Sequence, residues 1–384
     1  MSAETTGWKT GWKRRLKLLV FSLIPLVALV LVGQLVASLT IHRSFTFGTD
    51  SLSGVTHYVM RVGRLPWSGT TVTALNSLGL PDGEFVNILP KGDCIHVVFS
   101  GDSFTFGDAV DGDSTWVSLI RQRTAHLNPD RCIRVFNIAQ RMTTIEQQAA
   151  RIRETRDLLQ PDIVVLGQFQ NDLTDLTMPG SIAYEPETSG HGTTFWGDIL
   201  RKSVPGFNSA LLRMVTYRSF AFLTANNYRL DVLSRWSVLA DTANGEFADR
   251  LKGIYRDMYA DLVQELRAQG VGFAVVILPS KMDLMAQRYP EGEFFRSLAE
   301  EFQVPYLDLT PTLSANRKPF PYQVYDGHLN ERGNRIVART VYDWMFVAGQ
   351  GPFASLRRGD TVVSDTGATG PDRPGHAPGP RSGL

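Results

Sequence analysis

Hydrophobic and polar positions follow two regular patterns along the chain, and from position 93 onward these patterns alternate. Short apolar runs of strand length are followed by longer segments whose apolar residues recur every three or four positions, the spacing of an amphipathic helix. The clearest such helix ends before Gly270 and carries on one side Leu251, Ile254, Tyr255, Met258, Leu262 and Leu266. The pattern therefore predicts strands that alternate with helices.

Five strands and five helices follow from this reading. The predicted strands are Cys94–Phe99, Ile133–Ile138, Ile163–Gly167, Phe273–Leu278 and Pro305–Leu307. The predicted helices are Thr115–Leu127, Thr144–Leu159, Phe247–Gln269, Glu293–Phe302 and Glu331–Val347. Nearly continuous apolar strands between amphipathic helices indicate a parallel sheet that is covered on both faces. The expected fold is a three-layer α/β/α sandwich of the flavodoxin-like type.

The N-terminal region has a different pattern, because the run from Leu18 to Ile41 contains no charged residue. As a helix this run would span ~36 Å, more than the ~30 Å hydrocarbon core of a bilayer. Basic residues precede it, which predicts a cytoplasmic segment 1–17, a transmembrane helix 18–41 and an exported remainder. We expect a single-pass membrane protein with its N-terminus in the cytoplasm and its main domain outside. A signal peptide cleaved after Ala37 is the alternative.

Composition shifts divide the rest of the chain. Residues 42–92 are rich in Gly, Thr and Ser and predict lead-in strands and turns, followed by the main domain over 93–348. Within that domain, 174–246 interrupts the alternation and is too apolar for a disordered loop, so it predicts a helical insertion over the sheet or a peripheral packing element. Residues 349–384 are rich in Gly, Pro and Arg and predict a disordered tail.

The charge balance and the cysteine content limit the classes of function that the sequence allows. Lys and Arg number 39 against 38 Asp and Glu, so nothing global indicates a nucleic-acid partner. Cys94 and Cys132 each open a predicted strand, which allows either a disulfide in an oxidising compartment or two half-buried thiols. The dispersed histidines form no zinc motif, and no phosphate loop or dinucleotide fingerprint occurs, so no metal or cofactor is implied.

Polar residues gather where the predicted strands end. In an open parallel sheet, ligands bind at the carboxyl ends of the strands. The residues that fall at this edge are Asp102, Ser103, Asn137, Ala139, Asn171, Asp172, Asp326, His328 and Asn330. The first strand ends in "SGDSFTFG", where a serine lies in a glycine-flanked turn. This edge is the predicted functional site.

Four of these segments resemble the signature blocks of the SGNH (GDSL) hydrolases, in the family's order. They are "SGDSFTFG", "FNIAQ", "FQNDL" and "YDGHLNERGN", and the upstream "ALNSLGL" resembles a lead-in of bacterial cell-surface members. The resemblance spans about Ala74 to Met345. Ala139 and Phe169 stand where the family has glycine, and one residue rather than two separates Asp326 from His328.

The resemblance implies roles that agree with the chemistry of the residues. Ester cleavage needs an activated hydroxyl, a base, a group that orients the base, and donors for the oxyanion. Ser103 would be the nucleophile, His328 the base and Asp326 the orienting carboxylate. The Ser103 N–H, the Ala139 N–H and the Asn171 side-chain amide would bind the oxyanion. Asp102 is expected to be structural and to hold the turn.

Several functions remain open at this point. The leading expectation is a membrane-anchored serine esterase that removes acyl groups, most plausibly acetyl, from a cell-surface glycan. A polysaccharide O-acetyltransferase with the same triad, a glycan-binding or exopolysaccharide-assembly protein without activity, and a lipid esterase are alternatives. The segment "LPSKMDLMAQRYPE" faintly resembles exopolysaccharide O-acetyltransferase domains, or is an ordinary strand-to-helix loop with one solvated lysine.

Overall fold

A five-stranded parallel sheet forms the centre of the computed structural model. The model describes residues 6–40, 43–49, 56–62, 70–83, 90–127, 132–177, 215, 222, 239, 245–323, 327–349 and 351–356. The strands are β4 (Ile95–Gly101), β5 (Ile133–Asn137), β6 (Ile163–Phe169), β7 (Gly272–Leu278) and β8 (Tyr306–Asp308). Their order is β5-β4-β6-β7-β8, and every neighbouring pair is parallel. The predicted parallel α/β fold is confirmed, and each strand begins and ends within two residues of its prediction.

The strand order places the first strand of this sheet, β4, between β5 and β6. The chain therefore leaves β4 toward one side of the sheet and later returns to its other side. Such a reversal of strand order opens a crevice outside the carboxyl ends of the strands, where α/β proteins bind ligands. The turn that follows β4 lies at this position.

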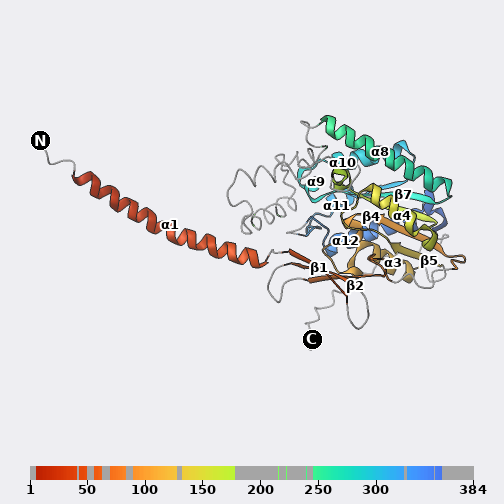
Figure 1. Ribbon diagram of the computed structural model, residues 1–384, viewed down its shortest axis with the longest axis horizontal. Helices are drawn as coiled ribbons and strands as arrows, with labels where there is room; N and C mark the ends of the chain where they lie inside the picture. The colour runs from red at the N-terminus through yellow and green to blue at the C-terminus, as the bar shows by residue number, and fades with distance from the viewer. Residues whose placement is uncertain are drawn as a thin grey trace, which may run out of the picture.

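Helices cover both faces of the sheet (Figure 1). One face carries α4 (Ile145–Leu159), α8 (Gly245–Ala268) and α10 (Pro290–Glu301). The other carries α3 (Trp116–Leu127), α11 (Thr310–Ala315) and α12 (Glu331–Tyr342). Neighbouring residues of one strand, such as Val97 and Val98, pack into opposite layers because side chains alternate along a strand. A π-helical segment, Asp343–Ala348, continues α12.

Shorter helices lie at the carboxyl ends of the strands. They are α2 (Ser103–Phe106) after β4, α5 (Asn171–Thr174) after β6 and α9 (Lys281–Ala286) after β7. None of them spans more than six residues. A segment of that length shows less than two turns of helical periodicity, so the hydrophobic pattern alone does not predict it.

The N-terminal part contains one long helix, α1 (Thr6–Thr40), and a separate three-stranded sheet. Its strands β1 (Arg43–Thr49), β2 (Thr56–Val62) and β3 (Thr70–Leu75) pair antiparallel in chain order. Lead-in strands were expected over 42–92. Of the helices in the ranges that the structure describes, none reaches the combined length and hydropathy needed to cross a membrane.

A disulfide joins Cys94 to Cys132 at the amino ends of β4 and β5. Next to it, the Ile95 N–H donates to the Cys132 carbonyl at 2.8 Å, and Ile95 pairs with Ile133 in the register of the sheet. Of the two alternatives for these cysteines, a disulfide or two thiols, the structure therefore contains the disulfide. The bond crosslinks the edge strand β5 to its neighbour, at the edge of the sheet opposite Ser103.

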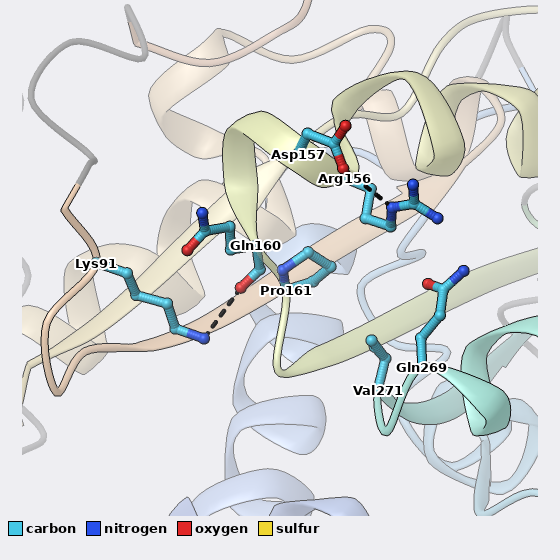
Figure 2. A pocket seen from close by; sticks show the side chains of 7 residues that line it. All are labelled: Lys91, Arg156, Asp157, Gln160, Pro161, Gln269 and Val271. Atoms are coloured by element: carbon cyan, nitrogen blue, oxygen red, sulfur yellow. Dashed lines mark hydrogen bonds and ion pairs between the residues drawn. The ribbon is translucent and has the colours of Figure 1, made fainter.

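A pocket of about 590 Å³ lies at the same amino edge (Figure 2). Its lining residues are Lys91, Arg156, Asp157, Gln160, Pro161, Gln269 and Val271. The Lys91 ammonium donates to the Gln160 carbonyl at 3.0 Å and pairs with Asp162 at 2.6 Å. These residues precede strands, whereas Ser103 follows one, so this pocket lies away from the predicted site.

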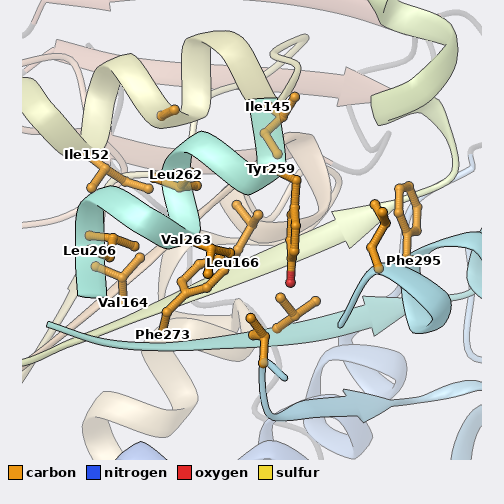
Figure 3. Close-up of a cluster of buried hydrophobic side chains, with 14 of the residues drawn as sticks. Ile145, Ile152, Val164, Leu166, Tyr259, Leu262, Val263, Leu266, Phe273 and Phe295 are labelled. Atoms are coloured by element: carbon orange, nitrogen blue, oxygen red, sulfur yellow. The ribbon is translucent and has the colours of Figure 1, made fainter. Parts of the chain in front are cut away.

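The apolar core between the sheet and α4, α8 and α10 is shown in Figure 3. Tyr259, Leu262 and Leu266 of α8 pack there against Val164 and Phe273 of the sheet. All five side chains are buried, which is the arrangement that the periodicity of this helix predicts. This packing fixes the positions of the strands, whose carboxyl ends carry the predicted site.

Two predicted segments lie largely outside the described residues. The helical insertion over 174–246 has described residues only up to 177, at three single positions and from 245 onward. The tail over 349–384 has described residues only at 349 and 351–356, where a 3₁₀ helix, Gly351–Leu356, buries Phe353 in the core. For the remaining residues of both segments, the assignments stay predictions.

A buried carboxyl in α9 predicts how stability depends on pH. Asp283 accepts a hydrogen bond from the Ser280 N–H at 2.6 Å, and burial together with the nearby Glu291 carboxylate raises the pKa of Asp283 from 3.8 to about 8. Between these pH values the folded protein keeps a proton that the unfolded chain has released, so the free energy of unfolding falls as pH rises. Asp283→Asn removes this titration. We expect wild type to lose stability relative to Asp283→Asn from about pH 4 to pH 8.

Urea denaturation of both proteins at pH 5 and pH 8 measures this difference. Asp257→Asn is the matched control, because the Asp257 side chain is 78% exposed on α8. Equal pH dependence in wild type and Asp283→Asn would contradict the prediction.

Candidate active site

Ser103 lies in a tight turn between β4 and α2. Asp102 caps α2, and its Oδ1 accepts the Phe104 N–H at 2.9 Å. The helix ends at Gly107, whose φ of 95° is left-handed and whose N–H donates to the Ser103 carbonyl at 3.0 Å. The turn thus places a serine at the first helical position with 9% of its surface exposed. Asp102 has the structural role that the sequence predicts.

Glycines let α2 pack directly on the ends of β4 and β6. A Cβ atom on Gly101 would lie 2.4 Å from Thr105 Oγ1 and 2.8 Å from the Gly167 carbonyl oxygen, and Gly101 also has a φ of +154°. A Cβ on Gly167 would lie 2.2 Å from the same Thr105 oxygen. From β5, Asn137 Nδ2 donates to the Thr105 carbonyl at 3.0 Å. Three strands therefore fix the helix that carries Ser103.

His328 meets Ser103 from the far end of the sequence. Its Nε2 lies 2.8 Å from Ser103 Oγ, across 225 residues of chain. Asn330 caps α12 by accepting the Gly333 N–H at 2.9 Å, which fixes the chain just after the histidine. The structure thus brings the predicted nucleophile and base together. Asp326 lies outside the described residues, so its orienting role stays a prediction.

A second carboxylate, which the sequence did not single out, faces the same imidazole. Asp108 Oδ2 lies 3.8 Å from His328 Nε2 and 2.6 Å from Arg141 Nε. Asp108 is buried and follows Gly107 directly, while Arg141 follows the end of β5. An acidic residue after a glycine turn is common at a surface, and only the three-dimensional contact with His328 distinguishes this one.

Two of the predicted oxyanion donors already donate hydrogen bonds to side chains of the protein. The Ala139 N–H donates to Asn137 Oδ1 at 3.0 Å, and Asn171 Nδ2 donates to Asp175 Oδ2 at 2.7 Å. The Asn171 amide carries a second hydrogen, and the Ser103 N–H begins a helix, where amides have no intrahelical acceptor. Oxyanion binding at Ala139 would require its present bond to be exchanged. The predicted oxyanion set therefore stays a prediction.

Phe169, which replaces a glycine of the family pattern, forms an aromatic stack beside the site. Its ring lies 3.5 Å from that of Phe104 with an interplanar angle of 21°, and the Phe104 ring lies 4.8 Å from the His328 ring. The Phe169 N–H donates to Asp172 Oδ2 at 2.9 Å. Phe169 thus supplies an apolar neighbour to Phe104, whose own ring lies beside that of His328.

Buried carboxyl groups lie around the nucleophile. Burial raises the pKa of Asp102 to about 7, although the Phe104 N–H and His328 lower it. Burial likewise raises the pKa of Asp175 to about 6 and that of Asp172 well above its usual range. A protonated carboxyl does not repel a developing oxyanion, so the raised pKa values of Asp102 and Asp172 reduce the electrostatic cost of negative charge beside Ser103 near neutral pH.

This arrangement is suited to acyl transfer. With its proton on Nδ1, the imidazole can accept the Ser103 hydroxyl proton at Nε2 while Oγ attacks a carbonyl carbon. The same imidazolium can then protonate the leaving alcohol. Among the described residues, no cluster of three or more His, Cys, Asp or Glu side chains has a metal-binding arrangement.

Comparison with known proteins identifies the family. Residues 99–336 match the model of the GDSL-like lipase/acylhydrolase family, and no curated protein matches the chain. Similar solved structures include the psychrotrophic esterase EstA from Pseudoalteromonas sp., at 11% identity and a TM-score of 0.36 over 65% of this chain and 94% of that one. An acetylxylan esterase, Axe2 from Geobacillus stearothermophilus, has 14% identity and a TM-score of 0.38 over 64% and 92%.

The family match covers more than half of the chain, including Ser103 and His328. It extends from β4 to α12, which is the α/β part of the molecule. The chain belongs to the GDSL-like lipase/acylhydrolase family of ester-hydrolysing enzymes.

Proposed function

We propose that this protein is a serine esterase in which Ser103 is the nucleophile and His328 the general base. Ser103 Oγ bonds to the acyl carbon, its proton passes to His328 Nε2, and the leaving alcohol takes that proton as its ester bond breaks. Water, activated by the same imidazole, then hydrolyses the seryl ester and releases the acid. The distance of 2.8 Å between Oγ and Nε2 is the observation that carries this proposal.

For the substrate, we propose acetyl esters of a cell-surface glycan. The support is the sequence, in which the four blocks resemble those of SGNH hydrolases and "ALNSLGL" resembles a lead-in of bacterial cell-surface members of that group. An O-acetyltransferase would form the same seryl ester and pass the acetyl group to a sugar hydroxyl instead of water. The two therefore differ only in the acceptor.

The test uses the full chain with p-nitrophenyl acetate and with an acetylated oligosaccharide. We expect release of acetate from both, and loss of that release in Ser103→Ala. Acetyl groups appearing on an added unacetylated oligosaccharide would indicate the transferase. Equal turnover in wild type and Ser103→Ala would refute the proposed nucleophile, and a lack of turnover in wild type would favour the non-catalytic alternative.

We also propose that the protein is exported and anchored to the cytoplasmic membrane through its N-terminal helix, with its N-terminus inside. Support comes from the uncharged run Leu18–Ile41 behind basic residues, and from the disulfide, which suits an oxidising compartment. We expect the protein in the membrane pellet after alkaline carbonate extraction, with its main domain open to protease added from outside. Recovery of the protein in the carbonate supernatant would contradict the anchor.

A further inference from the structure

The loop that carries His328 is closed by one residue, Gln323. The Gln323 N–H donates to the His328 carbonyl at 2.8 Å, and Tyr322 forms a β-bridge with Leu329 just outside it. These bonds define a short loop with the catalytic histidine at one end. The position of the imidazole relative to Ser103 therefore depends on what holds Gln323.

Two further hydrogen bonds connect Gln323 to other parts of the fold. Its side-chain Nε2 donates to the Ala109 carbonyl at 2.8 Å, in the segment that follows the nucleophile turn. Its own carbonyl accepts a hydrogen bond from Lys281 Nζ at 2.9 Å, and Lys281 begins α9 after strand β7. One residue thus links the histidine loop to the nucleophile segment and to the carboxyl end of β7.

Lys281 is not the solvated lysine that an ordinary strand-to-helix loop would carry. It is only 6% exposed, and its Nζ lies 5.7 Å from the centre of the Phe320 ring. Burying an ammonium group is costly unless it gains hydrogen bonds or charge partners. A buried lysine whose ammonium binds the base of the histidine loop is therefore expected to have a role that an apolar residue could not replace.

We propose that Lys281 is a positioning residue for catalysis, which fixes the Gln323 carbonyl and through it the distance between His328 Nε2 and Ser103 Oγ. This inference rests on the proposed function. Because Lys281 acts through Gln323 and the histidine loop, its loss displaces the base without removing it. Misplacement of a catalytic group by about 1 Å costs on the order of a hundredfold in rate.

The test compares Lys281→Met, which keeps the length of the side chain, with Lys91→Met. Lys91 donates to a backbone carbonyl at 3.0 Å in the same way, but at the amino edge of the sheet. We expect kcat for p-nitrophenyl acetate to fall about tenfold to a hundredfold in Lys281→Met with KM changed by less than about threefold. Lys91→Met keeps the wild-type kcat, and Lys281→Arg recovers part of the loss.

A second measurement distinguishes a loss of positioning from a general loss of folding, and it does not depend on the proposed esterase activity. Amide hydrogen exchange in a peptide covering residues 322–330 should be faster in Lys281→Met than in wild type, and unchanged in Lys91→Met. This readout needs no turnover, so it tests Lys281 even if wild type fails to hydrolyse esters. A Lys281→Met protein with kcat within about twofold of wild type, an equal loss in Lys91→Met, or unchanged exchange would each overturn the inference.

Discussion

Ser103→Ala is expected to lower kcat/KM for p-nitrophenyl acetate by about 10⁴-fold or more. Without the hydroxyl, no seryl ester can form, and the remaining groups can only bind the substrate. His328→Gln should cost a similar factor, because Ser103 then keeps its proton. The double variant should be no slower than either single one, since both residues serve the same step. A double-mutant cycle of wild type, the two single variants and the double variant measures this.

Controls for this experiment come from the same chain. Ser297 is an exposed serine on α10 that donates to its own helix, and His126 is exposed at the end of α3. Ser297→Ala and His126→Gln should keep wild-type turnover, while thermal unfolding shows whether each variant is folded. If the effects of Ser103→Ala and His328→Gln add, the two residues act in separate steps and the proposed mechanism is wrong.

Gly101→Ala is expected to destabilise the fold by about 2–4 kcal/mol, the largest stability effect that we predict. The new methyl group meets the Gly167 carbonyl oxygen at 2.8 Å and Thr105 Cβ at 2.9 Å, and the backbone has a φ of +154°. Neither obstacle can rotate away, because one is backbone and the other is fixed by α2. Urea denaturation measures the loss of unfolding free energy.

Gly167→Ala provides an internal comparison, because its closest conflict is with the Thr105 hydroxyl at 2.2 Å. Thr105→Ala removes that hydroxyl. In a Thr105→Ala background, Gly167→Ala should therefore cost much less than it does alone, whereas Gly101→Ala should stay costly. If Thr105→Ala relieved both substitutions equally, contact with the Gly167 carbonyl would not be the cause.

The sheet and its long helices were predictable because their signals are local. A buried strand such as β6 needs an uninterrupted apolar run, and a helix such as α8 shows more than six turns of periodicity. The pairing of Ser103 with His328 was also predictable, because each residue lies in a motif that resembles a signature block of a known family. In both cases the information lies in consecutive residues.

Contacts between distant polar residues were not predictable in the same way. Lys281 bonds to the carbonyl of a residue 42 positions away, and Asp108 pairs with an arginine 33 positions away. Neither contact leaves a pattern in one sequence, because backbone carbonyls carry no residue identity and charged residues are mostly exposed. The bond from the Ala139 N–H to the Asn137 side chain was missed although it is local, because an asparagine side chain can bond to many alternative groups and its identity does not fix which one it takes.

The separation of 225 positions between the proposed nucleophile and its base has a consequence for biosynthesis. A growing polypeptide exposes the serine early, but the imidazole emerges from the ribosome only after β8 and most of the sheet have been made. Prematurely terminated products that end before residue 328 would hold an unactivated hydroxyl. Ester cleavage by this pair thus requires nearly the entire α/β body to have been made.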